Sequence, residues 1–175
     1  MFPDNDRLLD LLGRPSEAAR PPAAPEGLVI PADYADLAAR LGAGVIDDHL
    51  RITVPDCPNP SFDLRQHIDD WRRALVDFRE FGVVPDDYCR PGHELLAFTS
   101  TTDGVNLYWM ATDGEPPEQW TVVLSDAGMD DWQQFDLPTS ECLVAILTGD
   151  LRVDMLDHWL PRERHEFVEF AMPAV

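Results

Sequence analysis

The chain has 175 residues, of which 33 are acidic and only 13 carry a permanent positive charge, all of them arginine, so the formal net charge is −20 at pH 7. Without a basic stripe to neutralise phosphates, nucleic-acid binding is excluded, and the same repulsion excludes anionic membrane surfaces. The charged partner that this composition favours is a cation, either a basic protein or a metal.

The length fits one compact domain. Three isolated cysteines, Cys57, Cys89 and Cys142, lack the spacing of a metal site or a disulfide framework, which predicts reduced thiols with Cys142 in the core. Residues 1–7 contain no apolar signal region, and the longest apolar run, 142–147, is far short of the ~20 residues that a membrane helix needs. We therefore expect a cytoplasmic protein.

Residues 1–27 are expected to form an N-terminal helix followed by a linker. Leucines recur within residues 4–12, and Asp4 or Asn5 is a candidate cap. The following stretch, 13–27, is rich in proline and cannot form a regular element. The pattern leaves open whether this N-terminal segment docks on the main domain, which is expected to span residues 28–175, or stays mobile.

Two helices and a strand are predicted in the first half of the main domain. Residues 31–41 have apolar side chains at helical spacing, and Gly42 supplies the stop. Residues 45–54 end in an alternating, strand-like half. The clearest helix covers residues 63–81. Its predicted buried stripe consists of Leu64, Ile68, Trp71, Leu75, Phe78 and Phe81.

The second half of the domain is predicted to be a meander. Strands are expected over residues 95–99, 106–112 and 120–124, with turns at Asp103-Gly104 and 113–117, and a short edge strand over 132–135. A last helix is expected through Leu147, capped by Thr139 or Ser140 and stopped by Gly149. This order predicts an α+β fold, in which an antiparallel meander sheet is packed with helices.

The order of these features resembles the SUKH superfamily, the Smi/Knr-type domain. The resemblance rests on Leu28-Val29-Ile30-Pro31-Ala32-Asp33-Tyr34 with Leu41-Gly42-Ala43-Gly44, on residues 95–104, on Leu107-Tyr108-Trp109, on residues 116–123, and on Trp132 and Phe135 ahead of the helix at 142–147. It covers most of residues 28–150, whereas residues 55–93 and the proline-rich start lie outside it.

The resemblance implies a Smi/Knr-like α+β domain that acts by binding proteins. Bacterial members of the family are commonly immunity proteins that neutralise toxins, often nucleases, of polymorphic toxin systems, and fungal members regulate cell-wall synthesis. The family offers no catalytic residues that could be transferred to this chain, so the resemblance implies no enzyme activity and no cofactor.

The charge distribution gives an independent indication of a basic partner. Between Arg90 and Arg152 the sequence has eleven acidic residues and no lysine or arginine. Some of these carboxylates are expected to pair with arginines of the helix at 63–81, and the rest to form a negative face that steers a cationic protein, such as a toxin domain. The residues predicted to contact that partner are Asp103, Asp113, Glu115, Glu118, Asp130, Asp131 and Trp132.

Two other functions remain open. The same fold could serve as a regulatory scaffold with an endogenous partner and no toxin. Alternatively, Asp47, Asp48 and His49 place carboxylates next to an imidazole, as in a metal site or the general base of a small hydrolase. In a strand end, neighbouring side chains point to opposite faces, so this triplet needs a bulge to converge on one ion.

Overall fold

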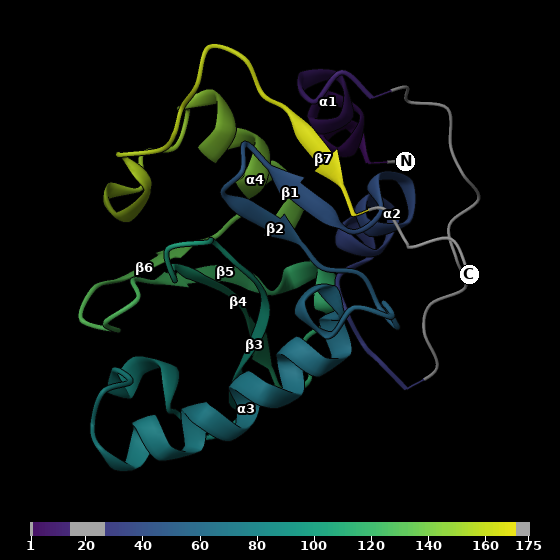
Figure 1. Ribbon diagram of the computed structural model, residues 1–175. Helices are drawn as coiled ribbons and strands as arrows, with labels where there is room; N and C mark the ends of the chain where they lie inside the picture. The colour runs from purple at the N-terminus through teal and green to yellow at the C-terminus, as the bar shows by residue number, and fades with distance from the viewer. Residues whose placement is uncertain (1, 15–26, 171–175) are drawn as a thin grey trace.

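Two antiparallel sheets and four α-helices make up the computed structural model over the residues that it describes, 2–14 and 27–170 (Figure 1). The helices are α1 (Pro3–Leu11), α2 (Ala32–Leu41), α3 (Leu64–Glu80) and α4 (Thr139–Thr148). The strands are β1 (Gly44–Ile46), β2 (Leu50–Ile52), β3 (His93–Ser100), β4 (Asn106–Thr112), β5 (Thr121–Ser125), β6 (Trp132–Phe135) and β7 (Phe167–Glu169). Short 3-10 turns are η1 (Pro60–Phe62), η2 (Asp86–Tyr88), η3 (Pro117–Gln119) and η4 (Asp154–Leu156). The α+β class predicted from the sequence is confirmed.

The predicted meander is the larger sheet, in the order β3-β4-β5-β6 with every neighbour antiparallel. The smaller sheet has the order β2-β1-β7. Its outer strand β7 was not predicted, because three residues are too few to show an alternating pattern. Gly44 lets β7 lie close to β1, since a Cβ at that position would stand 2.4 Å from the carbonyl oxygen of Val168.

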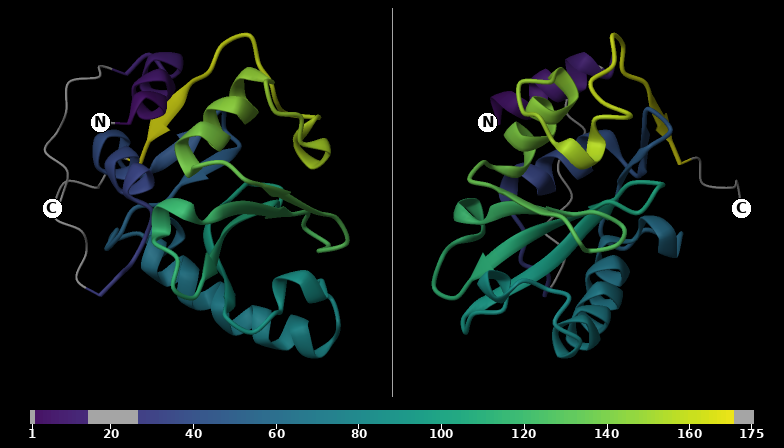
Figure 2. Two further views of the ribbon diagram at one scale, coloured as in Figure 1. Left: turned by 180° about the vertical axis from the view of Figure 1, so that it is seen from behind. Right: turned by 90° about the vertical axis from the view of Figure 1, so that its left-hand side faces the viewer.

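The four-stranded sheet separates two apolar layers (Figures 1 and 2). One face, with the rings of Phe98 and Trp109 stacked at 4.6 Å and Tyr34 edge-on to both, belongs to the core shared with α1, α2 and α4. The opposite face lies against α3, where buried Leu75 belongs to the same apolar cluster as Tyr108 of β4. The central strands β4 and β5 therefore alternate between two buried layers, which fixes their register.

The N-terminal helix is docked on the main domain. Leu8 and Leu9 are buried in the core shared with α2 and α4. The amide of Asn5 donates to the backbone oxygen of Asp33 at 2.8 Å, and Asp6 pairs with Arg40 at 2.6 Å. The open question about the helix is thus answered, whereas residues 15–26 of the proline-rich stretch lie outside the described residues.

Three details predicted from the sequence are wrong. Neither Asp4 nor Asn5 caps α1, because the helix already begins at Pro3 and its N-cap position, Phe2, has no capping side chain. Phe81 is 80 % exposed, because α3 ends at Glu80 and the buried stripe ends with it. Neither Thr139 nor Ser140 provides the N-cap of α4, which follows Pro138 without a cap from its own side chains. The capping acceptor is instead the buried carboxylate of Asp33 in α2.

Cys142 is fully buried as predicted, and burial raises the pKa of its thiol to about 12. Within 2–14 and 27–170, no helix combines the length and the apolar character needed to cross a bilayer.

Candidate functional site

The meander divides the predicted contact residues between its two ends. The β3–β4 turn and the β5–β6 loop lie together, since a Cβ on Gly104 would stand 2.9 Å from the Cβ of Ala127. They form the Asp130 end, with Asp103, Asp130, Asp131 and Trp132. The β4–β5 loop forms the opposite, Glu115 end, with Asp113, Glu115 and Glu118. Seven-residue β4 separates the ends by roughly 23 Å. The structure therefore brings the predicted residues together as two groups and not as one face.

Most of the eleven carboxylates between Arg90 and Arg152 have no cation beside them within residues 2–14 and 27–170. Glu94 pairs with Arg72 at 2.6 Å, and Asp150 pairs with Arg7 at 3.3 Å. Asp103 lies 3.4 Å from the imidazole of His49. Removing these three from eleven leaves eight without an ionic partner among the described residues: Asp113, Glu115, Glu118, Asp126, Asp130, Asp131, Asp136 and Glu141.

The Glu115 end has three exposed carboxylates on one loop. Asp113, Glu115 and Glu118 follow β4, and η3 shapes the return to β5. Asp136 adds a fourth, because β6 ends with Phe135 opposite Val122 at this same end. Neighbouring like charges repel one another, so the approach of a cation lowers the electrostatic free energy of this end.

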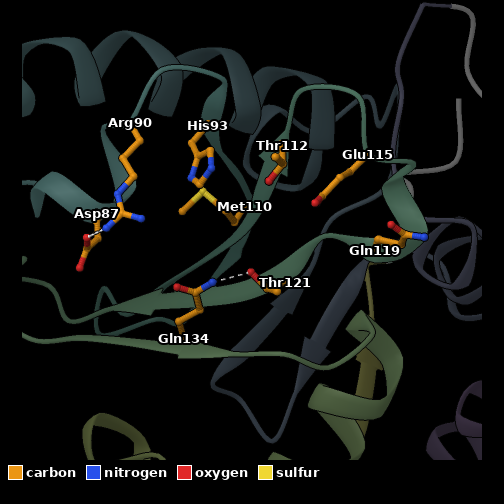
Figure 3. Close-up of a pocket in the computed structure, with 9 residues that line it drawn as sticks. All are labelled: Asp87, Arg90, His93, Met110, Thr112, Glu115, Gln119, Thr121 and Gln134. Atoms are coloured by element: carbon orange, nitrogen blue, oxygen red, sulfur yellow. Dashed lines mark hydrogen bonds and ion pairs between the residues drawn. The ribbon is translucent and has the colours of Figure 1, made fainter.

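A polar groove of about 340 Å³ opens beside Glu115 on the α3 side of the sheet (Figure 3). Side chains from the η2–β3 segment and from β4, β5 and β6 line it: Asp87, Arg90, His93, Met110, Thr112, Glu115, Gln119, Thr121 and Gln134. Within it, Gln134 Nε2 donates to Thr121 Oγ1 at 2.9 Å, and Arg90 pairs with Asp87. Glu115 is left as the lining carboxylate without an ionic partner among the described residues.

The groove can receive a polar side chain. His93 Nδ1 is buried without a hydrogen-bond partner within the described chain, and the threonine and glutamine side chains offer both donors and acceptors. A second cavity of about 430 Å³ lies between α3 and the start of the β4–β5 loop, where Arg72 is already paired with Glu94. No cluster of side chains suited to a metal ion occurs among the residues that the structure describes.

At the Asp130 end, Asp126 organises the loop. Its carboxylate accepts backbone N–H bonds from Gly128, Asp130 and Asp131, at 3.3, 2.8 and 3.0 Å. Met129 takes up a positive φ of 59° in this loop and is buried. The side chains of Asp130 and Asp131 are exposed, so the loop presents two adjacent carboxylates to solvent.

Much of the Trp132 side chain packs against its own domain. Its indole N–H donates to the Met129 carbonyl at 2.8 Å, and its ring lies 5.8 Å from Tyr108 and 5.3 Å from Tyr88. Trp120 is half-buried and packs against the core shared with α1, α2 and α4. Of the tryptophans considered, Trp132 therefore offers only part of its ring to a partner.

Asp103 is exposed, but other parts of the chain engage its carboxylate. Its carboxylate accepts hydrogen bonds from Thr101 and from the indole of Trp159, the latter at 3.1 Å, and it lies beside His49. Burial favours the neutral acid, but these hydrogen bonds and His49 outweigh it and lower the pKa of Asp103. Asp103 thus joins the β3–β4 turn to the C-terminal segment, and it is not free for a partner as Asp130 and Asp131 are.

Asp47, Asp48 and His49 do not converge. The carboxylate of Asp47 lies 2.7 Å from Nδ1 of His165, whereas the His49 ring stacks on Trp159 with 4.5 Å between the ring centroids. Asp48 is exposed. The pKa of His49 is lowered, and burial is the main cause. Sequence reasoning missed these partners because His165 lies 118 positions from Asp47, and no local pattern signals such a pair.

Comparisons with protein-family models, with curated proteins and with solved structures found no match for this chain.

Proposed function

We propose that the protein is a non-catalytic, acidic protein-binding domain of the SUKH type, and that it acts in the cytoplasm as an immunity protein that neutralises a nuclease-type toxin. The observation that carries this proposal is the set of eight carboxylates without ionic partners in the described structure, gathered largely at the two ends of one sheet. Such an arrangement costs free energy in the isolated chain and is relieved by a basic partner.

A nuclease must be positively charged where it holds phosphate, which makes it a suitable partner. Complementary charge raises association rates by roughly 10- to 1000-fold at low salt. For an immunity protein, fast association matters because the toxin has to be bound before it reaches its substrate. Binding through carboxylates requires no cofactor and no metal.

A regulatory scaffold with an endogenous basic partner would use the same surfaces. The genomic neighbourhood separates the two functions: a toxin reading frame immediately upstream favours the immunity protein, and its absence favours the scaffold. The hydrolase or metalloenzyme alternative is less well supported, because Asp47 and His49 are each engaged by a different part of the C-terminal segment.

The test is co-expression with the product of the neighbouring gene, followed by affinity measurements on charge-neutralised variants. We expect Asp130→Asn with Asp131→Asn, or Glu115→Gln with Glu118→Gln, to weaken binding. The matched control is Asp154→Asn with Asp157→Asn, which removes the same charge from two residues already paired with Arg152. Equal affinities for the site and control variants would contradict the proposal.

A further inference from the structure

The two edges of the four-stranded sheet differ in how they are covered. Beside β3, the backbone carbonyl of Phe98 accepts a hydrogen bond from Thr53, and the N–H of Thr102 donates to the His49 carbonyl at 2.9 Å. The β1–β2 hairpin and the residue that follows it thus cover the β3 edge from Phe98 onward. The β6 edge, by contrast, has no strand beyond it in the described structure, and its hairpin reaches the margin of the molecule in Figure 1.

The register shows which backbone groups of β6 point outward. The N–H of Asp126 donates to the carbonyl of Asp131, which makes this a hydrogen-bonded pair. Pairs alternate along an antiparallel ladder, so Gln133 bonds to Leu124, whereas Trp132 and Gln134 direct their N–H and C=O groups away from β5. No described residue forms a hydrogen bond with these outward backbone groups.

Carboxylates lie at both ends of this open edge. Asp130 and Asp131 precede β6, Asp136 follows it, and all three are exposed without an ionic partner among the residues described. A second copy of the chain pairing through β6 would bring these carboxylates together in either strand direction, which is unfavourable. A cationic strand would instead place its charges beside them.

We propose that the β6 edge is the docking site for an extended, cationic segment of a partner protein, which adds as a fifth strand to the sheet. The segment pairs with the outward groups of Trp132 and Gln134, and its basic side chains lie near Asp130, Asp131 and Asp136. Gln134 also lines the polar groove, so a side chain of the added strand can enter toward Glu115. This inference rests on the proposed function, because it assigns the binding mode of the same basic partner.

The probe is a blocked seven-residue peptide that alternates arginine with valine and threonine. Amide hydrogen exchange should slow at Trp132 and Gln134 when the peptide binds. Gln134→Pro removes one outward N–H without interrupting the ladder to β5, and we expect binding about tenfold weaker. Gln134→Thr is the matched control, which retains the N–H and should bind within about twofold.

A peptide with every amide N-methylated keeps its charge but cannot donate to the edge, and it should lose binding even if Gln134→Pro misfolds. The inference is overturned if the methylated peptide binds as well as the parent, or if protection appears at β7 and not at β6. Weaker binding of the neighbouring-gene product to Asp130→Asn with Asp131→Asn, without protection at β6, would overturn strand addition but leave the proposed function standing.

Discussion

Asp33→Ala tests how two distant helices are joined. The carboxylate of Asp33 is 7 % exposed and accepts hydrogen bonds from the Tyr34 N–H at 2.8 Å and from the N–H and hydroxyl of Ser140 at 2.8 and 3.0 Å. It also places a negative charge at the N-terminus of α4, where the helix dipole favours one. Hydrogen bonds to charged groups contribute about 1.5–3 kcal/mol each and are not additive. We therefore expect the free energy of unfolding to fall by about 4 kcal/mol.

The assay is urea denaturation followed by far-UV circular dichroism. Asp33→Asn keeps one acceptor oxygen and should lose about half as much stability as Asp33→Ala. Asp77→Ala, an exposed position on α3, is the control and should change stability by less than about 0.5 kcal/mol. A loss below about 1 kcal/mol for Asp33→Ala would refute the assignment of Asp33 as the cap of α4.

Two other predictions concern pH and packing. Burial lowers the pKa of His67 to about 4, so the unfolded chain binds a proton at this imidazole more tightly, and stability falls as the pH drops below about 6.5. His67→Gln should remove about 1 kcal/mol of the stability loss between pH 6.5 and 5.5, measured by denaturant titration. An unchanged dependence of stability on pH in this variant would contradict the prediction. Gly44→Ala places a methyl group against β7, so it should lower the free energy of unfolding by about 2 kcal/mol and speed amide hydrogen exchange at Val168. Unaltered exchange at Val168 would show that β7 does not need the close approach to Gly44.

The elements that follow from local pattern were predictable from the sequence. The amphipathic stripe of α3 and the turns around Gly104 and Gly114 place a helix and three strands within a few residues of their observed bounds. The four-residue edge strand β6 was also predicted with its observed bounds. Periodicity and turn chemistry act within short windows, and these elements depend on little else.

What could not be predicted depends on contacts between distant residues. Asp33 caps a helix 107 positions away, and β7 joins its sheet from the far end of the chain. The candidate site shows the same limit. The sequence indicates an excess of carboxylates, and the predicted meander already places the turn with Asp113 and the loop with Asp130 at opposite ends of the sheet. Only side-chain geometry, however, shows that Asp103 is engaged by His49 and Trp159.

The most direct test of the acidic binding surface is the salt dependence of association with the product of the neighbouring gene, followed by stopped-flow fluorescence. If unpaired carboxylates steer a basic partner, the association rate constant should fall at least about tenfold between low and physiological salt. The fall should be clearly smaller for Asp130→Asn with Asp131→Asn than for the wild-type chain. A rate constant that does not respond to salt, with tight binding retained, would contradict the account.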